Sequence, residues 1–233
     1  MATVVLLRHA RSTANGSGVL AGRSEGVRLD PSGEKQAAAL VDRLAGVTLH
    51  GLVRSPLLRC AQTLAPLSSA RGLEPVVEDA LAEVDYGAWT GKEIKELVEE
   101  PLWKVVQQHP SAAVFPGGEG LAEVQARAVR AVREHDARIT AEHGERAVWL
   151  LCSHGDVIKS VLSDALGQHL DTFQRIVVDP ASVSVVRYTP TRPFVLRMND
   201  SGSEFAGIVP PEPKPDEDPA KAGDATVGGS TGR

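Results

Sequence analysis

The sequence predicts an α/β three-layer sandwich, in which a mostly parallel central sheet is flanked by helices. Short aliphatic runs alternate along the chain with longer segments whose apolar residues recur at helical spacing. The runs are apolar throughout, as expected for strands covered on both faces. A hydrophobic fraction of 42% over 233 residues is enough for one sizeable core, so we expect a single domain over residues 1–209.

The expected strands are short, aliphatic or β-branched, and bounded by turn-forming residues. Four of them cover residues 3–7, 51–54, 75–78 and 147–152. Three more are expected late in the chain, at residues 175–178, 183–188 and 194–198, where they would form the antiparallel edge of the sheet.

Two helices stand out between the strands. Residues 31–44 are expected to form a connecting helix, and residues 119–143 a long amphipathic one. Between the apolar positions of the long helix lie Arg127, Arg130 and Arg133, which we interpret as a solvated face. Residues 210–233, rich in Pro, Gly, Asp and Glu, are expected to form a disordered tail.

Composition excludes several classes of function. A formal net charge of -5 argues against general affinity for nucleic acid, which requires basic clusters. No stretch approaches the ~20 apolar residues that span a bilayer. The only cysteines, Cys60 and Cys152, form neither a disulfide framework nor a paired metal-ligand spacing. We therefore expect a cytoplasmic protein with no nucleic-acid or membrane partner.

Two of the predicted strands end on a histidine. The segment RHARSTAN (8–15) follows the first strand, and CSHGD (152–156) closes the fourth. Ligands of open α/β sheets bind beyond the carboxyl ends of the strands, so His9 and His154 are expected to share one crevice. Arg59 follows the second strand and is expected at the same rim.

These residue types suit phosphoryl transfer without a metal. The guanidinium groups of Arg8 and Arg59 can each make forked, charge-assisted hydrogen bonds to phosphate oxygens. A neutral His9 imidazole can then attack phosphorus and form a phosphohistidine, while the arginines and His154 stabilise the negative charge. We expect a small phosphorylated substrate.

A proton donor for the leaving oxygen is expected in the segment LAEVDYGAWTG (81–91). Glu83 is the preferred candidate: when protonated it can donate to the departing alkoxide, and as a carboxylate it can accept a proton from water in the second step. Asp85 is the alternative, and either residue can instead cap or solvate a turn.

Four segments in this order resemble the histidine phosphatase superfamily, the phosphoglycerate-mutase-like group. RHARSTAN is similar to the signature Arg-His-Gly-x-Ser/Thr-x-x-Asn, and SPLLRCAQT, LAEVDYGAWTG and CSHGD look like the family's arginine, acid/base and second-histidine segments. The resemblance implies catalytic roles for His9 and Glu83, phosphate contacts from Arg8, Asn15, Arg59 and His154, no metal or other cofactor, and a homodimer or higher homo-oligomer.

Within the superfamily, AVFPGGEGLAEVQARA (113–128) resembles the Pro-Gly-Gly-Glu-Ser helix entry of the broad-specificity phosphatase branch, with Gly120 in place of Ser. The stretch between Glu83 and that helix is shorter than in glycolytic mutases. The resemblance therefore favours hydrolysis of small phosphate monoesters over the alternative, phosphoglycerate mutase-type transfer. A scaffold with a vestigial pocket is disfavoured, because every expected polar side chain is present.

The substrate side of the pocket is less defined. Family members usually have Gly where Ala10 stands, and a positive φ there would cost Ala about 1–2 kcal/mol. Arg11, where the family often has Glu, is expected to add positive charge beside the pocket. Residues 99–120 are expected to form a lid that contacts the alcohol portion of the substrate. Trp89 and Trp103 are expected to pack in the core, with pocket lining as the alternative.

Overall fold

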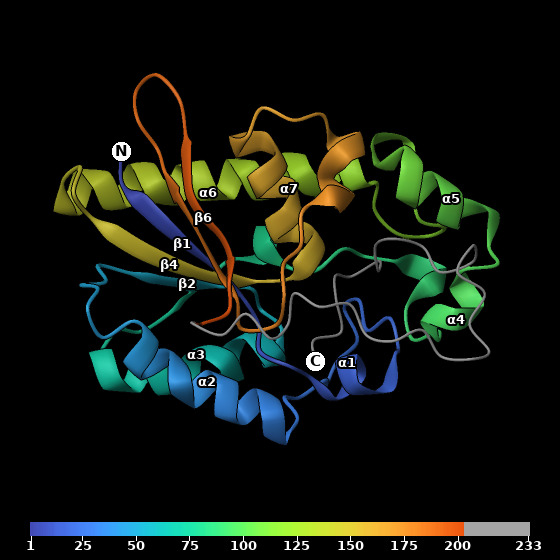
Figure 1. Ribbon diagram of the computed structural model, residues 1–233, viewed down its shortest axis with the longest axis horizontal. Helices are drawn as coiled ribbons and strands as arrows, with labels where there is room; N and C mark the ends of the chain where they lie inside the picture. Colours follow the sequence, from blue (N-terminus) through green and yellow to red (C-terminus); the bar gives the residue numbers. More distant parts are fainter. Residues whose placement is uncertain (203–233) are drawn as a thin grey trace.

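The fold is a six-stranded sheet between two layers of helices, shown by a computed structural model that describes residues 1–202 (Figure 1). The strand order is β3-β2-β4-β1-β5-β6. The first four strands in this order are paired in parallel, and β5 runs antiparallel to both of its neighbours, β1 and β6. The predicted sandwich is therefore confirmed. The strands are β1 (Thr3–Arg8), β2 (Leu52–Arg54), β3 (Val76–Val77), β4 (Val148–Ser153), β5 (Val183–Arg187) and β6 (Phe194–Asp200).

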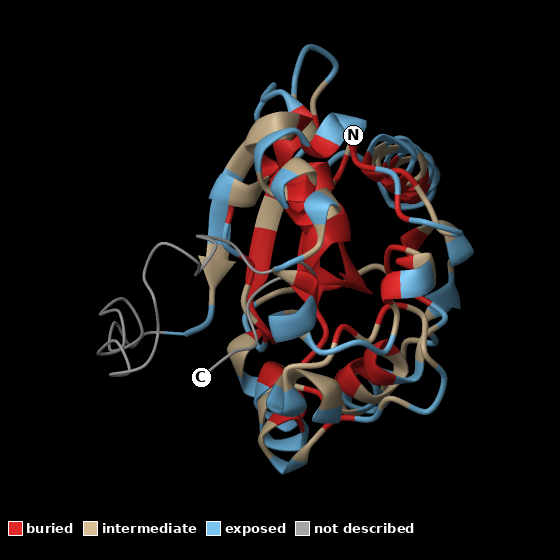
Figure 2. Ribbon diagram, turned by 90° about the vertical axis from the view of Figure 1, so that its right-hand side faces the viewer, coloured by how far each residue is buried: buried red, intermediate tan, exposed pale blue. Residues whose placement is uncertain are grey.

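Each face of the sheet packs against its own helices. In Figure 1, α2 (Pro31–Arg43) and α3 (Leu58–Arg71) lie on one side of the sheet, and α6 (Leu121–His143) and α7 (Gly155–Ala165) on the other. Alternate strand residues point to opposite faces, so Leu6 joins the α6/α7 core and Leu7 joins the α2/α3 core. Buried residues accordingly fill the central strands in Figure 2.

The ends of the helices follow from local sequence. Asp30 begins α2 by accepting a hydrogen bond from the Gly33 amide at 2.8 Å, with Pro31 in the first turn. The α6 helix buries the apolar positions predicted from its periodicity, including Val124, Ala128 and Ile139. The shorter helices are α1 (Thr13–Ser17), α4 (Ile94–Leu97), α5 (Pro101–Gln108), η1 (Asp79–Leu81), η2 (Gly87–Trp89), η3 (Pro110–Ala112) and η4 (Leu170–Arg175).

Two strand predictions need correction. Residues 175–178 are not a strand: η4 ends at Arg175, and the chain continues as an irregular segment. Ile176 and Val178 are apolar because they fill the α6/α7 core, while Val177 between them is 54% exposed. The strand expected at residues 75–78 is reduced to two residues, both exposed, because it lies at the edge of the sheet.

The strain considered for Ala10 does not arise. The described non-glycine residues with positive φ are Ala181 and Asn199. Ala10 is fully buried, and its amide donates to Thr63 Oγ1 at 2.9 Å.

No helix within residues 1–202 has both the length and the apolar character needed to cross a membrane. The tail predicted at residues 210–233 lies outside the described residues, and so does the end of the predicted 1–209 domain.

Candidate active site

The two histidines meet because they follow neighbouring parallel strands. Arg8 at the end of β1 is in register with Ser153 at the end of β4, so His9 and His154 emerge side by side. Their ring centroids are 5.2 Å apart. Both are buried, at 3% and 0% exposure, and His154 begins α7. The shared crevice predicted from the strand ends is therefore present.

The His9 imidazole is held neutral with a defined tautomer. Its Nδ1 lies 2.8 Å from the carbonyl oxygen of Ala10, which can only accept, so Nδ1 carries the proton and Nε2 the lone pair. Burial, followed by the positive charges of Arg59 and Arg8, holds the pKa of His9 well below its usual value. A neutral imidazole with a free Nε2 lone pair is the form required for nucleophilic attack.

His154 has the opposite tautomer. The Arg59 guanidinium can only donate, and it lies 3.1 Å from His154 Nδ1. The proton therefore sits on Nε2, which donates to Ser55 Oγ at 2.7 Å. Burial and the charge of Arg59 hold the pKa of His154 well below its usual value. The same arginine also donates to the carbonyl of Gly22 at 2.9 Å, so its side chain is fixed at both sides.

Arg8 is fully buried at the end of β1. Its guanidinium donates to the carbonyl of Val178 at 2.7 Å. Burial lowers the pKa of Arg8 from its usual value, while the negative charges of Glu83, Asp156 and Asp179 favour the charged form. Val178 and Asp179 escape prediction from sequence, because they lie about 170 residues along the chain from Arg8 in an irregular segment.

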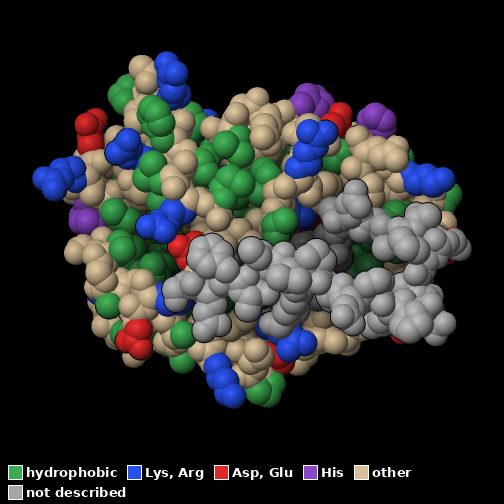
Figure 3. All heavy atoms as spheres, viewed as in Figure 1, with side chains coloured by type: hydrophobic (Ala, Val, Ile, Leu, Met, Phe, Trp, Pro, Cys, Tyr) green, Lys and Arg blue, Asp and Glu red, His purple; other side chains and the backbone are tan. Residues whose placement is uncertain are grey.

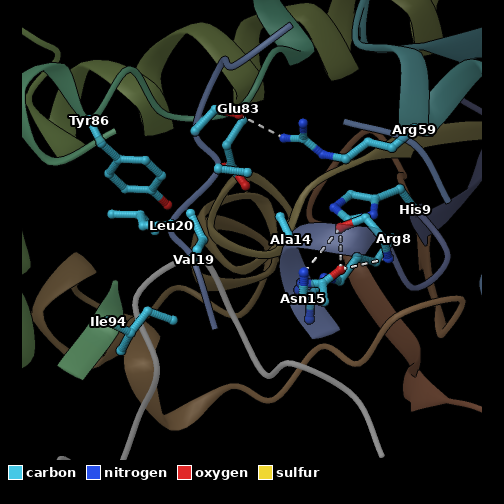
Figure 4. Close-up of a pocket in the computed structure, with 13 residues that line it drawn as sticks. Arg8, His9, Ala14, Asn15, Val19, Leu20, Arg59, Glu83, Tyr86 and Ile94 are labelled. Atoms are coloured by element: carbon cyan, nitrogen blue, oxygen red, sulfur yellow. Dashed lines mark hydrogen bonds between the residues drawn. The ribbon is translucent and has the colours of Figure 1, made fainter. Parts of the chain in front are cut away.

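Glu83, not Asp85, lines the pocket (Figure 4). Glu83 is 4% exposed; its Oε1 accepts from the Val84 amide at 3.0 Å, and its Oε2 lies 3.8 Å from Nδ1 of His154. Burial, followed by the negative charge of Asp156, raises the pKa of Glu83 to about 7. The side chain of Asp85 instead accepts from the Gly87 amide at 3.0 Å and shapes the turn.

A cluster of Arg23, Glu119 and Arg127 holds the backbone of Glu83. Arg23 Nε and the Arg127 guanidinium donate to the carbonyl of Glu83 at 2.8 and 3.2 Å. Glu119 joins the two arginines through its Oε2, which accepts from them at 2.8 and 3.0 Å. It also accepts from the Asp85 amide at 3.0 Å. We call these three residues the Glu119 cluster.

The Glu119 cluster corrects the interpretation of the arginines on α6. The side chain of Arg127 is only 18% exposed and donates to the carbonyl of Glu83, whereas Arg130 is exposed as expected. Arg133 pairs with Asp164 at 3.0 Å. No sequence pattern marks the role of Arg127, because its contacts depend on how the loop before α6 folds back onto the loop after Glu83.

Asn15 lines the pocket from α1. Its Oδ1 accepts from both the amide and the hydroxyl of Ser12, at 3.0 and 2.8 Å. Because the oxygen is committed to this cap, the Nδ2 amide is the Asn15 group suited to contact a ligand.

The pocket also has an apolar side that sequence analysis placed elsewhere. None of its lining residues falls within the predicted lid at 99–120, because Trp103 and Val106 of α5 turn into the core. Trp103 stacks on Trp89 with ring centroids 6.2 Å apart, so the packing interpretation of both is confirmed. The lining consists of Arg8, His9, Ser12, Ala14, Asn15, Val19, Leu20, Ala21, Gly22, Arg59, Glu83, Tyr86 and Ile94.

Two predicted contributors lie outside this lining. His154 is outside the lining, but its Nδ1 lies 3.1 Å from the Arg59 guanidinium and 3.8 Å from Glu83 Oε2, and both of these residues line the pocket. Arg11 is turned toward Asp30, with NH1 to Oδ2 at 3.5 Å, so its charge is partly neutralised away from the pocket. Within residues 1–202, no group of three His, Cys, Asp or Glu side chains is arranged to hold a metal ion.

Comparison with known proteins agrees with this geometry. Phosphoserine phosphatase 1 of Hydrogenobacter thermophilus is 32% identical over 206 residues, covering 85% of this chain and 92% of that protein. A Yersinia enterocolitica protein named probable phosphoglycerate mutase GpmB is 30% identical over 190 residues, covering 81% and 86%. The solved structure of a mycobacterial glucosyl-3-phosphoglycerate phosphatase has the same fold, with a TM-score of 0.75, 23% identity, and coverage of 85% and 98%.

The family model for the histidine phosphatase superfamily (branch 1) matches residues 4–201, a span that includes both histidines, both buried arginines and Glu83. The chain belongs to the histidine phosphatase superfamily.

Proposed function

We propose that the protein is a metal-independent phosphatase that hydrolyses small phosphate monoesters through a phosphohistidine on His9. The observation that carries this proposal is that His9, whose Nδ1 is bonded to the Ala10 carbonyl so that Nε2 holds the lone pair, lines one pocket together with Arg8, Arg59 and Glu83. Membership of the superfamily and the phosphatases among its relatives support hydrolysis of phosphomonoesters.

In the first step, the phosphoryl group binds between the guanidinium groups of Arg8 and Arg59, with the Asn15 amide as a further donor. His154 contributes through Arg59, because its Nδ1 accepts from that guanidinium and orients it. His9 Nε2 attacks phosphorus in line with the ester oxygen. The new P–N bond replaces the P–O bond, and the arginines stabilise the charge on the equatorial oxygens.

Glu83 moves the proton in both steps. With a pKa of about 7 its carboxyl is largely protonated in mildly acidic solution, and it donates that proton to the leaving alkoxide. The resulting carboxylate then accepts a proton from the water that attacks the phosphohistidine. This second displacement breaks the P–N bond, releases inorganic phosphate, and returns neutral His9 and protonated Glu83.

The test is phosphate release from a panel of esters and 3-phosphoglycerate, with chelator present, by the intact protein and by His9→Ala. The proposal expects release by the intact protein and none by the variant. Isomerisation of 3-phosphoglycerate without release of phosphate would favour the mutase alternative, which the similarity to a probable phosphoglycerate mutase also supports. Silence on every ester would favour a vestigial pocket.

We also propose a homodimer that pairs through β6. This strand lies at the edge of the sheet, and its side chains Phe194, Leu196 and Met198 are 42%, 50% and 43% exposed. Apolar side chains gather over the β5–β6 region in Figure 3. Light scattering should give a dimer mass for the intact protein and a monomer mass for Leu196→Asp. A monomer mass for both would refute the dimer.

A cytoplasmic location completes the proposal. Cys60 and Cys152 are buried free thiols, as suits a reducing compartment. Cell fractionation should find the protein with cytoplasmic markers, and recovery with exported proteins would refute this location.

A further inference from the structure

One side of the pocket is built from two backbone segments held together by hydrogen bonds. The amide of Leu20 donates to the carbonyl of Lys92 at 2.9 Å, and the Gly91 amide donates to the carbonyl of Leu20 at 2.8 Å. The amide of Ile94 donates to the carbonyl of Gly18 at 3.0 Å. These three hydrogen bonds, which form a short backbone ladder, hold Val19, Leu20 and Ile94 beside one another.

These side chains form a wall without charge. We call Ala14, Val19, Leu20, Ala21 and Ile94 the apolar wall. Figure 4 shows Val19, Leu20 and Ile94 on the side of the pocket away from Arg8 and His9, where the alcohol portion of an ester would lie once its phosphoryl group is bound by the arginines.

The hydroxyl of Tyr86 and the cations next to the apolar wall are paired with carboxylates. Tyr86 presents its ring to the pocket, but its hydroxyl donates to Asp156 Oδ2 at 2.8 Å. The neighbouring cations each face a carboxylate: Lys92 and Glu100 at 3.8 Å, Lys95 and Glu93 at 2.6 Å, and Arg23 and Glu119 at 2.8 Å.

A charged alcohol would therefore lack a partner. Among residues 1–202, the cations that line the pocket are Arg8 and Arg59, and both are needed for the phosphoryl group. A carboxylate on the alcohol would be desolvated against methyl groups. For an ammonium group, the acidic side chain in the lining described within residues 1–202 is Glu83, which must be protonated to act as the acid. Apolar carbon atoms in the same place would gain from burial.

We propose that the pocket selects phosphate monoesters of uncharged, largely apolar alcohols and discriminates against alcohols that carry a carboxylate or ammonium group. This inference rests on the proposed phosphatase function. The preferred substrates would then differ from phosphoserine, the substrate in the name of the relative from Hydrogenobacter thermophilus.

The experiment compares kcat/KM for ethyl, butyl and hexyl phosphate with kcat/KM for O-phosphoserine and 3-phosphoglycerate. The alkyl alcohols leave with similar basicity, so differences among them report contact with the wall. We expect kcat/KM to rise roughly threefold per methylene from ethyl to butyl phosphate, as partial burial of each group predicts. Both charged esters should fall about tenfold or more below butyl phosphate.

Three variants of the apolar wall and one control variant locate the effect. Val19→Ala and Ile94→Ala should lower the ratio of kcat/KM for butyl over ethyl phosphate about threefold each. Val76→Ala is the matched control, because this valine is 46% exposed on β3 at the edge of the sheet, and it should leave the ratio unchanged. Val19→Lys should reverse the preference by raising kcat/KM for 3-phosphoglycerate and lowering it for butyl phosphate.

The outcomes separate the two proposals. A higher kcat/KM for phosphoserine or 3-phosphoglycerate than for butyl phosphate would overturn the substrate class while leaving phosphatase function intact. An unchanged butyl-to-ethyl ratio in both alanine variants would overturn the role of the apolar wall. No phosphate release from any ester, including p-nitrophenyl phosphate, would overturn the proposed function and this inference with it.

Discussion

The raised pKa of Glu83 makes a quantitative prediction about pH. A carboxyl with the ordinary pKa of 4.5 would be protonated in only about one molecule in 300 at pH 7, whereas a pKa of about 7 leaves half of the molecules protonated. If Glu83 donates the proton to the leaving oxygen, kcat/KM for an alkyl phosphate should fall roughly tenfold between pH 6 and pH 8.

The assay uses two substrates so that other ionisations cancel. Butyl phosphate needs a proton on its leaving oxygen, whereas p-nitrophenolate departs without one. Ionisation of His9 affects both esters alike, and each kcat/KM is first corrected for the ionisation of its own ester, because the phosphate of p-nitrophenyl phosphate is more acidic than that of butyl phosphate. The ratio of the two kcat/KM values should therefore follow a single titration near pH 7 and plateau in acid. In Glu83→Gln the ratio should be roughly 100-fold or more lower and independent of pH.

A ratio that stays flat from pH 6 to pH 8 in the intact protein would refute this assignment of the acid. A normal titration in Glu83→Gln would move the role to another group. Asp85→Asn serves as the control for the neighbouring carboxylate, because the Asp85 side chain shapes a turn and lies outside the pocket lining.

Three further predictions follow from the same geometry. Arg127→Met should lower kcat for butyl phosphate about tenfold with little change in KM, because the carbonyl of Glu83 loses a donor. The control Arg130→Met, on the exposed face of α6, should have no effect, and equal losses in both variants would contradict the role of the Glu119 cluster. The depressed pKa of His9 should keep its imidazole neutral as pH falls through 6.5, so nitrogen NMR of labelled protein should show a proton on Nδ1 and no titration of the ring near pH 6.5. A doubly protonated His9 ring at pH 6 would contradict this prediction. Glu83→Gln should stabilise the protein above pH 7, because the raised pKa of Glu83 gives a contribution to stability that is full below pH 4.5 and lost as pH rises through about 7, a difference of up to roughly 3 kcal/mol. Thermal unfolding that shows no gain in stability for the variant at pH 8 relative to pH 4 would refute this linkage.

The parts of the site that sequence predicts are those fixed by the sheet. His9 and His154 follow adjacent parallel strands, so their meeting depends only on the register between β1 and β4. Arg59 follows β2 by a short turn into α3 and is constrained in the same way. Residues within a few positions of a strand end inherit the place of that strand, which is why a linear pattern locates them.

The parts that sequence misses depend on loop packing. Arg127 has helical periodicity typical of a solvated face, yet it reaches Glu119 and the carbonyl of Glu83 because two loops fold toward it. The strand expected at 175–178 is absent, because Ile176 and Val178 pack in the core from an irregular segment. The substrate side is formed by residues 19–21 and 94, where a ladder between distant segments sets the pocket wall.

If the phosphoryl group passes through His9, the phosphohistidine can be trapped. Rapid mixing with a labelled ester, followed by a denaturing quench at alkaline pH, should leave label on a peptide that contains His9. The label should accumulate further in Glu83→Gln with p-nitrophenyl phosphate, because the water that hydrolyses the intermediate lacks its base, and it should be absent in His9→Ala. Phosphate release by His9→Ala at the rate of the intact protein, or label on another residue, would show that the phosphoryl group does not pass through His9.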